Sequence, residues 1–405
     1  MLISLLIIAT IILSYWNGAN DNFKGVATLY GSGTLSYQSA IIMATVTTFL
    51  GSVSAIYIAQ GLIASFSGKG LVPQEVAGTT IFLISTGLGA ASTILLATRL
   101  GFPISTTHSL VGGLLGAGFM SVGMEVDFAK LGTVYLIPLL VSPFIAFCLS
   151  IVIFKIVKLL TNQPIKTQNN SNSNNNSSSV DIDLLSAHKT HNNLLCSNTG
   201  NWYPQPLNSA VLTGFSHHLE DKNRCLLASS NKALDIDSKQ AKSTVDIKSE
   251  NMSTSPANLM SMAHIFSAAS VSFARGLNDT PKIAGLLVAV ELLNIQFGML
   301  TIAFGMAIGG LLNARKVAET ISYKITKINN ELGFSANLVT SFLVIVASKF
   351  GIPVSTTHVS VGSIFGASML TEQRNHKMIS SILLSWIITL PSAMLFSGII
   401  YWLLS

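Results

Sequence analysis

Residues 101–108 read Gly-Phe-Pro-Ile-Ser-Thr-Thr-His, and residues 351–358 read Gly-Ile-Pro-Val-Ser-Thr-Thr-His. A second pair of stretches precedes them in the same order, because residues 18–24 and residues 276–282 share the pattern Gly-x-Asn-Asp-x-x-Lys. Apolar stretches of similar length lie between and after the two motifs in each copy. Recurrence of a whole segment is the signature of an internal repeat. We therefore predict that the chain consists of two related halves.

The composition is that of a membrane protein. Hydrophobic residues make up 49% of the 405 residues and charged residues 10%, whereas soluble domains carry about 25% charged residues. A helix that crosses the hydrocarbon core of a bilayer needs about 20 apolar residues. We predict an all-α polytopic protein of a cell membrane, inner or plasma, surrounded by lipid. Apolar stretches of about this length are Ser36–Gln60, Val76–Thr98, Leu131–Val157, Phe297–Asn313 and Met378–Leu404.

The chain begins with an apolar run, Met1–Trp16, that has no basic segment in front of it. A secretory signal peptide would have such a segment. The run also leads directly into the first Asn-Asp motif. We therefore expect it to be the first part of a membrane-spanning helix.

A hydrophilic segment separates the two halves. Residues 169–179 read NNSNSNNNSSS, and low hydrophobicity persists to about residue 258. Such a segment cannot bury enough apolar surface to offset the loss of chain entropy, so it is expected to be disordered. The predicted domains are a first membrane repeat over residues 1–160, a disordered cytoplasmic insert over residues 161–258, and a second membrane repeat over residues 259–405.

Basic residues indicate how the halves cross the membrane. They cluster in residues 155–158, 315–327 and 374–377, and the positive-inside rule places these clusters in the cytoplasm. This placement explains the net charge of +6 without nucleic-acid binding. It puts both termini outside and the insert inside, so the halves cross in opposite directions. Inverted-topology repeats with broken helices near the midplane are a transporter architecture.

The Asn-Asp-x-x-Lys motif places ionisable side chains at membrane depth in both halves. An ionised side chain there costs at least about 2.5–3.5 kcal/mol, so it faces the protein interior or a water-filled cavity. Positions i and i+3 share a helix face, so we expect Asp21 to pair with Lys24, and Asp279 with Lys282. Ion pairs that only fix helix packing are the alternative, which the duplication of so costly a device disfavours. Helix-breaking residues near both motifs predict broken helices whose backbone groups bind ions. These residues are Gly18, Gly25, Gly276 and Pro281.

The Ser-Thr-Thr-His motif follows a Gly-x-Pro turn in both halves. Gly-x-Pro breaks a helix and Ser-Thr-Thr is a strong N-cap for the next one, so the flanking apolar stretches predict a re-entrant helical hairpin. A helix N-terminus offers amide groups and a positive dipole end to an anion. Two such tips facing each other would surround a tetrahedral oxyanion with amides and hydroxyls. Ordinary helix capping is the alternative, which the duplication disfavours.

Residues that follow the serine and threonines have structural interpretations. We expect hydrogen bonds of His108 and His358 to orient the turns, in preference to carrying protons. Gly112-x-x-x-Gly116 and Gly362-x-x-x-Gly366 predict close packing against neighbouring helices.

Two other classes of function fit parts of this pattern. An intramembrane hydrolase would use a hydroxyl of the motif with His108 or His358, but a nucleophile requires one specialised copy. Both halves carry the motif equally. An anion channel needs an open pore, whereas paired motifs at broken helices fit alternating access. We therefore predict a transporter that is not an enzyme and has no cofactor.

These motifs resemble those of the inorganic phosphate transporter family, whose members are sodium- or proton-coupled symporters. The resemblance rests on Gly18-Ala-Asn-Asp21, Gly276-Leu-Asn-Asp279 and the two Pro-x-Ser-Thr-Thr-His turns, and it covers both membrane halves. It implies an inverted-repeat transport domain, a homodimer, and phosphate held between the halves. The function that it implies is secondary active import of inorganic phosphate coupled to a cation.

The resemblance also implies which residues form the site. Asn20, Asp21, Asn278 and Asp279 would bind the coupling cation as well as substrate. The motif lysines are added to the substrate site because of their charge. The full predicted set is Asn20, Asp21, Lys24, Ser105, Thr106, Thr107, Asn278, Asp279, Lys282, Ser355, Thr356 and Thr357.

The chain departs from the family pattern at one point. The family usually continues Asn-Asp with Val-Ala-Asn, whereas this chain has Asn22-Phe-Lys24 and Thr280-Pro-Lys282. A fixed ammonium beside the aspartate could take the place of a bound sodium ion, or neutralise the substrate. The coupling ion, Na⁺ or H⁺, therefore stays open at this stage.

The aspartates also bear on the choice of oxyanion. Phosphate carries a proton that can be donated to a carboxylate, whereas sulfate near neutral pH carries none, and an unpaired buried carboxylate costs affinity. This favours phosphate. Because the lysines could satisfy the aspartates internally, a sulfate or other oxyanion permease of the same architecture remains the alternative.

Overall fold

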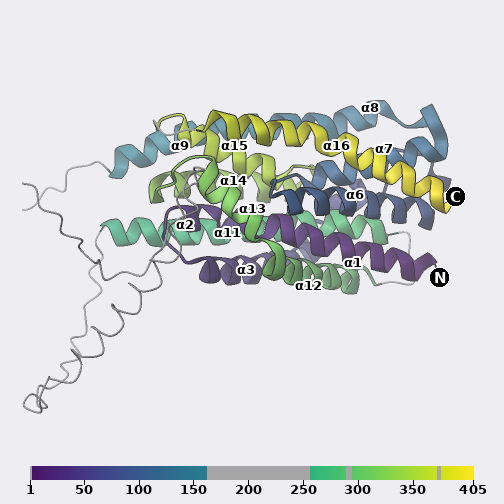
Figure 1. Ribbon diagram of the computed structural model, residues 1–405, viewed down its shortest axis with the longest axis horizontal. Helices are drawn as coiled ribbons and strands as arrows, with labels where there is room; N and C mark the ends of the chain where they lie inside the picture. Colours follow the sequence, from purple (N-terminus) through teal and green to yellow (C-terminus); the bar gives the residue numbers. More distant parts are fainter. Residues whose placement is uncertain (1, 162–255, 289–293, 372–374) are drawn as a thin grey trace, which may run out of the picture. The chain divides into compact units, whose positions relative to one another are not determined.

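The computed structural model describes residues 2–161, 256–288, 294–371 and 375–405 (Figure 1). Most of the predicted insert over residues 161–258 lies outside these ranges. The described residues form helices and, apart from an isolated bridge between Lys69 and Val72, no β structure. The all-α prediction is therefore confirmed for the part of the chain that the structure describes.

The first half comprises several long helices joined by short ones. Among the short elements, η1 and η2 are 3₁₀ turns and η3 is a π-helical turn. The elements are α1 (Leu2–Asp21), η1 (Asn22–Gly25), α2 (Ala27–Gly31), α3 (Tyr37–Ile58), α4 (Gln60–Ser65), α5 (Gln74–Ala77), α6 (Thr80–Leu100), α7 (Thr106–Val122), η2 (Gly123–Glu125), α8 (Phe128–Lys130), η3 (Leu131–Leu136) and α9 (Ile137–Thr161).

The second half follows a similar order. It contains the 3₁₀ turn η4 and the π-helical turn η5. The elements are α11 (Pro256–Ala284), η4 (Gly285–Leu287), α12 (Ile295–Asn313), α13 (Arg315–Glu319), η5 (Thr320–Lys324), α14 (Asn330–Lys349), α15 (Thr356–Ser368) and α16 (His376–Leu404).

Seven helices among the described residues are long and apolar enough to cross a membrane. Each of the predicted apolar stretches, including Met1–Trp16, overlaps one of them. The chain is therefore a multi-pass integral membrane protein. The seven spans are Leu2–Gly25, Tyr37–Ile58, Thr80–Leu100, Phe128–Thr161, Ile295–Asn313, Asn330–Lys349 and Lys377–Leu404.

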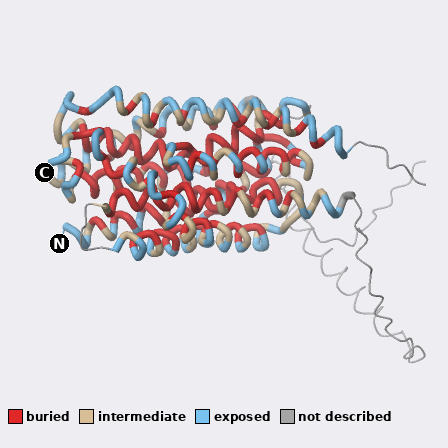
Figure 2. The backbone as a smooth tube through the Cα atoms, turned by 180° about the vertical axis from the view of Figure 1, so that it is seen from behind, coloured by how far each residue is buried: buried red, intermediate tan, exposed pale blue. Residues whose placement is uncertain are grey.

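Helix α11 is long but is not among these seven spans, and it carries the second charged motif. Residues 274–287 are all buried, and Figure 2 shows buried segments through the middle of the helix bundle. The outer helices α9 and α16 instead expose large apolar side chains, including Leu140 (71% exposed) and Ile387 (71% exposed). Water would disfavour such a surface, whereas lipid suits it. The polar motifs thus lie inside and the apolar surface lies outside.

The equivalent helices of the two halves start at opposite ends of the bundle. Helix α1 begins at the end where α16 finishes, whereas α11 begins at the other end, near the end of α9 (Figure 1). The predicted inversion of the repeats requires this difference in direction. The inversion itself remains a prediction.

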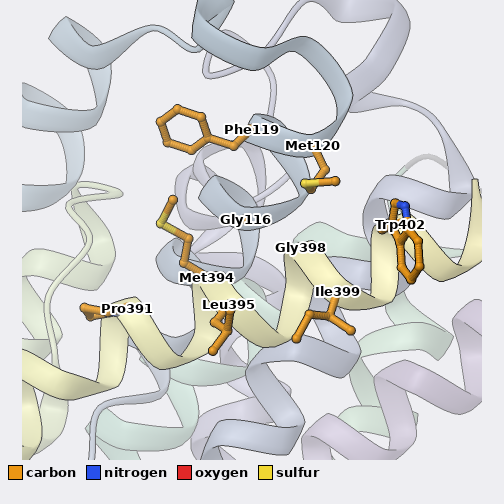
Figure 3. A pocket seen from close by; sticks show the side chains of 9 residues that line it. All are labelled: Gly116, Phe119, Met120, Pro391, Met394, Leu395, Gly398, Ile399 and Trp402. Carbon is orange, nitrogen blue, oxygen red and sulfur yellow. The ribbon is translucent and has the colours of Figure 1, made fainter.

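Glycines allow close helix crossings at equivalent places in both halves. A Cβ atom on Gly116 would lie 2.0 Å from the carbonyl oxygen of Met394, and one on Gly366 would lie 2.2 Å from that of Phe147. Figure 3 shows the first of these crossings, where α7 passes α16. The prediction of close packing at the Gly-x-x-x-Gly motifs is confirmed.

The two motif turns join helices that pack as hairpins. Helix α6 ends at Leu100 and is followed by the C-cap Gly101, which has φ of 78°, and α7 begins after the N-cap Ser105. The equivalent turn has Gly351 at φ of 66° and the N-cap Ser355. Positive φ is accessible to glycine at little cost, which explains why each turn begins with this residue. That the hairpins are re-entrant remains a prediction.

The predicted helix breaks are observed in one half only. In the first half α1 ends at Asp21 and the chain continues as the 3₁₀ turn η1. In the second half α11 continues through the motif and through Pro281 to Ala284, so the expectation of a break at this motif is wrong. The continuous helix holds Arg275, Asp279 and Lys282 on one face, where contacts between positions i and i+3 or i+4 stabilise helical geometry.

Candidate functional site

The first Asn-Asp-x-x-Lys motif forms a buried ion pair. Asp21 and Lys24 are 1% and 3% exposed, and their side chains are in direct contact. The Lys24 ammonium also donates to Asn20 Oδ1 (2.9 Å), to the carbonyl oxygen of Ile104 (2.7 Å) and to Thr357 Oγ1 (2.6 Å). The last acceptor belongs to the other half of the chain. Lys24 therefore has a shell of oxygens from three separate segments.

The second motif repeats this arrangement. The Lys282 ammonium lies 3.5 Å from Asp279 Oδ1, and it donates to the carbonyl oxygen of Val354 (2.6 Å) and to Thr107 Oγ1 (2.8 Å). Val354 is the counterpart of Ile104, and Thr107 is the counterpart of Thr357. Each lysine thus binds the turn carbonyl of its own half and a threonine of the other half. The predicted ion pairs of both motifs are confirmed.

The two Ser-Thr-Thr turns meet each other. Thr107 Oγ1 donates to the carbonyl oxygen of Val354 (3.1 Å), and Thr357 Oγ1 donates to that of Ile104 (2.9 Å). These contacts link residues that are 247 and 253 positions apart in the sequence. The N-termini of α7 and α15, with their positive dipole ends, consequently converge on the same buried region.

Ser105 and Ser355 act as N-caps of these helices. Ser105 Oγ accepts from the backbone amide of His108 (3.1 Å), and Ser355 Oγ accepts from that of His358 (3.2 Å). This is the capping geometry expected of serine at a helix start. Among the predicted site residues, the two serines therefore shape the turns.

The motif asparagines also bind the turns. Asn20 Nδ2 donates to Thr98 Oγ1 (2.9 Å), and Asn20 Oδ1 accepts from the backbone amide of Ile104 (3.2 Å). In the second half Asn278 Oδ1 accepts from Ser348 Oγ at 3.1 Å. Ser348 is the counterpart of Thr98. Asn278 Nδ2 also donates to the carbonyl oxygen of Val354 in the turn (3.3 Å). Each asparagine thus fixes its motif to the helical hairpin of the same half.

Arg275 belongs to this buried cluster, although the sequence analysis did not assign it to the site. It is 1% exposed and lies one position before the motif glycine. Its guanidinium is 3.5 Å from Asp279 Oδ2 and donates to Asn17 Oδ1 (3.3 Å) and Asn22 Oδ1 (3.5 Å). The sequence did contain a signal for Arg275. It occupies the position directly before the motif glycine, which is Asn17 in the first copy.

The cluster carries an excess of positive charge. Lys24, Arg275 and Lys282 provide three cations, and Asp21 and Asp279 provide two carboxylates, so one positive charge is formally left over. A buried charge without a counter-charge costs several kcal/mol. An anion bound at this place would supply the missing negative charge.

The two copies differ in how fully their groups are hydrogen-bonded. Thr106 Oγ1 donates to Asp21 Oδ2 (3.0 Å) and accepts from Asn17 Nδ2 (2.7 Å). The counterpart Thr356 makes no side-chain hydrogen bond to the described residues, and Asp279 Oδ2 accepts none. Arg275 also belongs to the second half, and its contacts with Asp279, Asn17 and Asn22 are long, at 3.3–3.5 Å. Hydrogen-bonding capacity therefore remains on the side of the second half.

The imidazoles do not have the role expected of them. His108 Nδ1 and His358 Nε2 are buried and have no hydrogen-bond partner among the described residues. Only the backbone amides of these residues contact the capping serines. The prediction that the side chains orient the turns by hydrogen bonds is wrong for these ring atoms, because the serines and the lysines already hold the turns.

An apolar groove of about 490 Å³ lies away from this cluster, between α7 and α16 (Figure 3). It offers no charged side chain and so has nothing to bind an oxyanion. Its lining residues are Gly116, Phe119, Met120, Pro391, Met394, Leu395, Gly398, Ile399 and Trp402.

The described residues contain no group of three or more His, Cys, Asp or Glu side chains that could hold a metal ion. Alkali cations in transporters bind carboxylates and the backbone carbonyls of broken helices. Oxygens of this kind surround Lys24, whose ammonium already contacts Asp21 and Ile104.

Comparison with known proteins gives consistent results. The model of the phosphate transporter family matches residues 17–397. A protein of Haemophilus influenzae that carries the name of a phosphate permease is 28% identical over 417 residues, covering 97% of this chain and 94% of that protein. A Pyrococcus furiosus protein with the same kind of name is 26% identical over 432 residues, covering 99% of this chain and 97% of that protein.

A solved structure is also similar. It is that of a protein called the sodium-dependent phosphate transporter, with a TM-score of 0.70 and 25% sequence identity. The similarity covers 100% of this chain and 98% of that chain. All these relatives are named as transport proteins, and none of the names is that of an enzyme.

Proposed function

This chain belongs to the phosphate transporter family, and from that premise we propose that it imports inorganic phosphate across a cell membrane together with a coupling cation. It is a multi-pass membrane protein and not an enzyme. The observation that carries the proposal is the convergence of the two Ser-Thr-Thr turns on two buried lysines, one of which shares its partner Asp279 with the buried Arg275. That arrangement combines helix N-termini, hydroxyls and positive charge in a region shared by both halves.

Phosphate is proposed to bind on the side of the second half. There the Thr356 hydroxyl and the Arg275 guanidinium retain donors, as described above. Guanidinium groups bind tetrahedral oxyanions through paired hydrogen bonds. Thr106, Thr107 and Thr357 are proposed to reorganise toward the anion, since each now donates to a protein oxygen.

The buried carboxylates support phosphate over sulfate. Asp279 Oδ2 accepts no hydrogen bond among the described residues and can accept one from a protonated phosphate oxygen. Sulfate offers no such proton and would face the carboxylate with an unpaired oxygen, which lowers its affinity.

The lysines bear on the coupling ion. The Lys24 ammonium contacts oxygen atoms of Asn20, Asp21 and Ile104. Oxygens of this kind would otherwise be able to bind sodium. We propose that the ammonium groups of Lys24 and Lys282 each take the place of a bound sodium ion. The chain would then require sodium less than a transporter with neutral residues at these positions, and a proton would be the coupling cation.

Counterflow in proteoliposomes tests the proposed function. Vesicles loaded with unlabelled phosphate should accumulate labelled phosphate transiently, because a carrier exchanges one for the other. Excess external sulfate should compete poorly. An enzyme would give no accumulation, a channel would give large currents, and either result would overturn the proposal.

A further inference from the structure

The two motif histidines form a contact pair between the halves. The ring centroids of His108 and His358 are 4.3 Å apart, at an interplanar angle of 72°. His108 is 9% exposed and His358 is 2% exposed. The indole ring of Trp386 lies against His358 with a centroid distance of 3.8 Å. Three polar rings from α7, α15 and α16 thus meet next to the substrate cluster.

These rings lack the hydrogen bonds that buried polar groups normally make. His108 Nδ1, His358 Nε2 and Trp386 Nε1 have no partner among the described residues. Leaving a buried donor or acceptor unpaired costs about 1–3 kcal/mol, so each such group in a native structure calls for an explanation.

A third buried histidine provides a contrast within the same chain. His264 is fully buried, and its two ring nitrogens lie 3.0 Å from Asn330 Oδ1 and 3.0 Å from Thr28 Oγ1. Its hydrogen-bonding capacity is used by the fold. The pair differs from it in having ring nitrogens that remain able to take up or release a proton.

The charged groups that act on the pair come from the substrate cluster. The Lys282 ammonium interacts electrostatically with His108, and the Lys24 ammonium interacts electrostatically with His358. Asp21, Asp279 and Arg275 lie behind these lysines in the ion pairs described above. Helices α7 and α15 carry no Asp, Glu, Lys or Arg. The other charged groups described on helices that pack around the pair lie toward helix ends: Arg99, Lys155, Lys158, Glu331, Lys349 and Lys377. The neutral titratable groups described on these helices are Cys148 and Tyr401.

We propose that His108 and His358 together bind the coupling proton, as a single site shared by the two halves. The inference rests on the proposed function and deepens it. A ring nitrogen takes the proton from water on one side of the membrane and releases it on the other, and no bond of the substrate breaks. The pair holds one proton and not two, because two unit charges at about 4 Å repel by about 4 kcal/mol at an effective dielectric constant of 20.

Charge balance explains why this proton would travel with the substrate. The cluster of three cations and two carboxylates has one excess positive charge, and a bound phosphate dianion changes the excess to one negative charge. A proton on the pair then restores neutrality. Because binding free energies are reciprocal, the anion favours the proton and the proton favours the anion. The indole of Trp386 would further stabilise an imidazolium through a cation–π contact.

The test measures protons moved per phosphate in proteoliposomes that contain a trapped pH-sensitive dye. The wild-type protein should acidify the lumen as labelled phosphate enters. In His108→Gln/His358→Gln the ratio of protons to phosphate should be lower by one. Stimulation of uptake by an inward proton gradient should fall by about tenfold, within the usual range of coupling between two sites. Exchange of labelled for unlabelled phosphate should remain measurable and shows that the variant is folded.

His264→Gln is the matched control, because it removes a buried imidazole whose nitrogens are already bonded. It should leave the proton-to-phosphate ratio unchanged. An unchanged ratio in the double variant that still exchanges phosphate would overturn the inference alone. Wild-type uptake without acidification would overturn it without any variant. Absence of phosphate exchange in the wild type would overturn the proposed function and this inference together.

Discussion

Individual side chains in the cluster combine charge with hydrogen bonding across the two halves. Asp21 and Asp279 each hold one lysine, and Arg275 adds a third cation on the second aspartate. In a buried region, removal of one partner of an ion pair leaves the other charge unpaired and costs about 3–5 kcal/mol. Substitutions that preserve shape are therefore the informative ones at this scale.

Asp21→Asn and Asp279→Asn should each reduce concentrative phosphate uptake by at least about tenfold, or 1.4 kcal/mol. The amide keeps the shape of the side chain but supplies no negative charge beside the lysine. Initial uptake rates in proteoliposomes, normalised to folded protein, measure the effect. Glu319→Gln is the control, since Glu319 is 46% exposed and pairs only with Arg315. Full uptake by both aspartate variants would refute the proposed site.

Arg275→Lys should raise KM for phosphate by about tenfold with a smaller change in kcat. The substitution keeps the positive charge but loses the planar set of donors that binds an oxyanion in paired fashion. Uptake measured over a range of phosphate concentrations separates the two constants. Arg315→Lys, at a position 77% exposed, serves as the control. Equal KM values in the two variants would argue against a phosphate contact by Arg275.

At the scale of elements, glycines fix how the helices cross. A Cβ atom on Gly276 would lie 2.0 Å from the carbonyl oxygen of Thr48, and one on Gly18 would lie 2.0 Å from that of Met306. The close crossings of α11 with α3 and of α1 with α12 thereby fix the positions of the two motifs within the helix bundle. Backbone carbonyls cannot move aside as a flexible side chain could, so these crossings depend on glycine.

Gly276→Ala should destabilise the protein by about 1–3 kcal/mol, the usual cost of overpacking. The thermal midpoint of the protein in detergent should fall, and uptake should fall with it because Asp279 and Lys282 shift. Gly132→Ala is the control, because it is the same substitution at a position where a Cβ atom would meet nothing within 4 Å. An equal midpoint for the two variants would contradict the assigned packing.

Sequence patterns predicted most of the elements, apart from the continuity of α11, but not the contacts between them. The hairpins and the pairing of Asp21 with Lys24 follow from local rules, namely capping, helix breaking and i to i+3 spacing. The contacts of Lys24 with Thr357 and of Lys282 with Thr107 span 333 and 175 positions and depend on packing that local rules do not describe. The same holds for the burial of Arg275. The expected break in α11 is absent because this part of the helix is buried on all sides, and tertiary packing can override the local helix-breaking tendency of a proline.

At the scale of the whole molecule, two copies of one device produce a single site. Each lysine binds a threonine of the other half, so neither half has a complete set of ligands alone. The apolar exterior of α9 and α16 is suited to lipid, whereas the motif charges of the described residues are buried in the interior. Movement of one half against the other would break and remake the contacts between lysines and threonines, as alternating access requires.

The proposed role of the lysines predicts how transport by the whole protein depends on ions. With ammonium groups resident in both cation positions, wild-type uptake should persist when choline replaces sodium. Lys24→Asn/Lys282→Asn would free the surrounding oxygens, so any uptake that this variant retains should require sodium. Lys327→Asn, which changes an exposed lysine, is the control and should behave as the wild type.

The most direct test of the account is uptake of labelled phosphate by the wild-type protein, in sodium and in choline, with unlabelled phosphate or sulfate as competitor. The account predicts uptake in both media, strong competition by phosphate and weak competition by sulfate. A steep sodium requirement that persists unchanged in Lys24→Asn/Lys282→Asn, or stronger competition by sulfate than by phosphate, would contradict it.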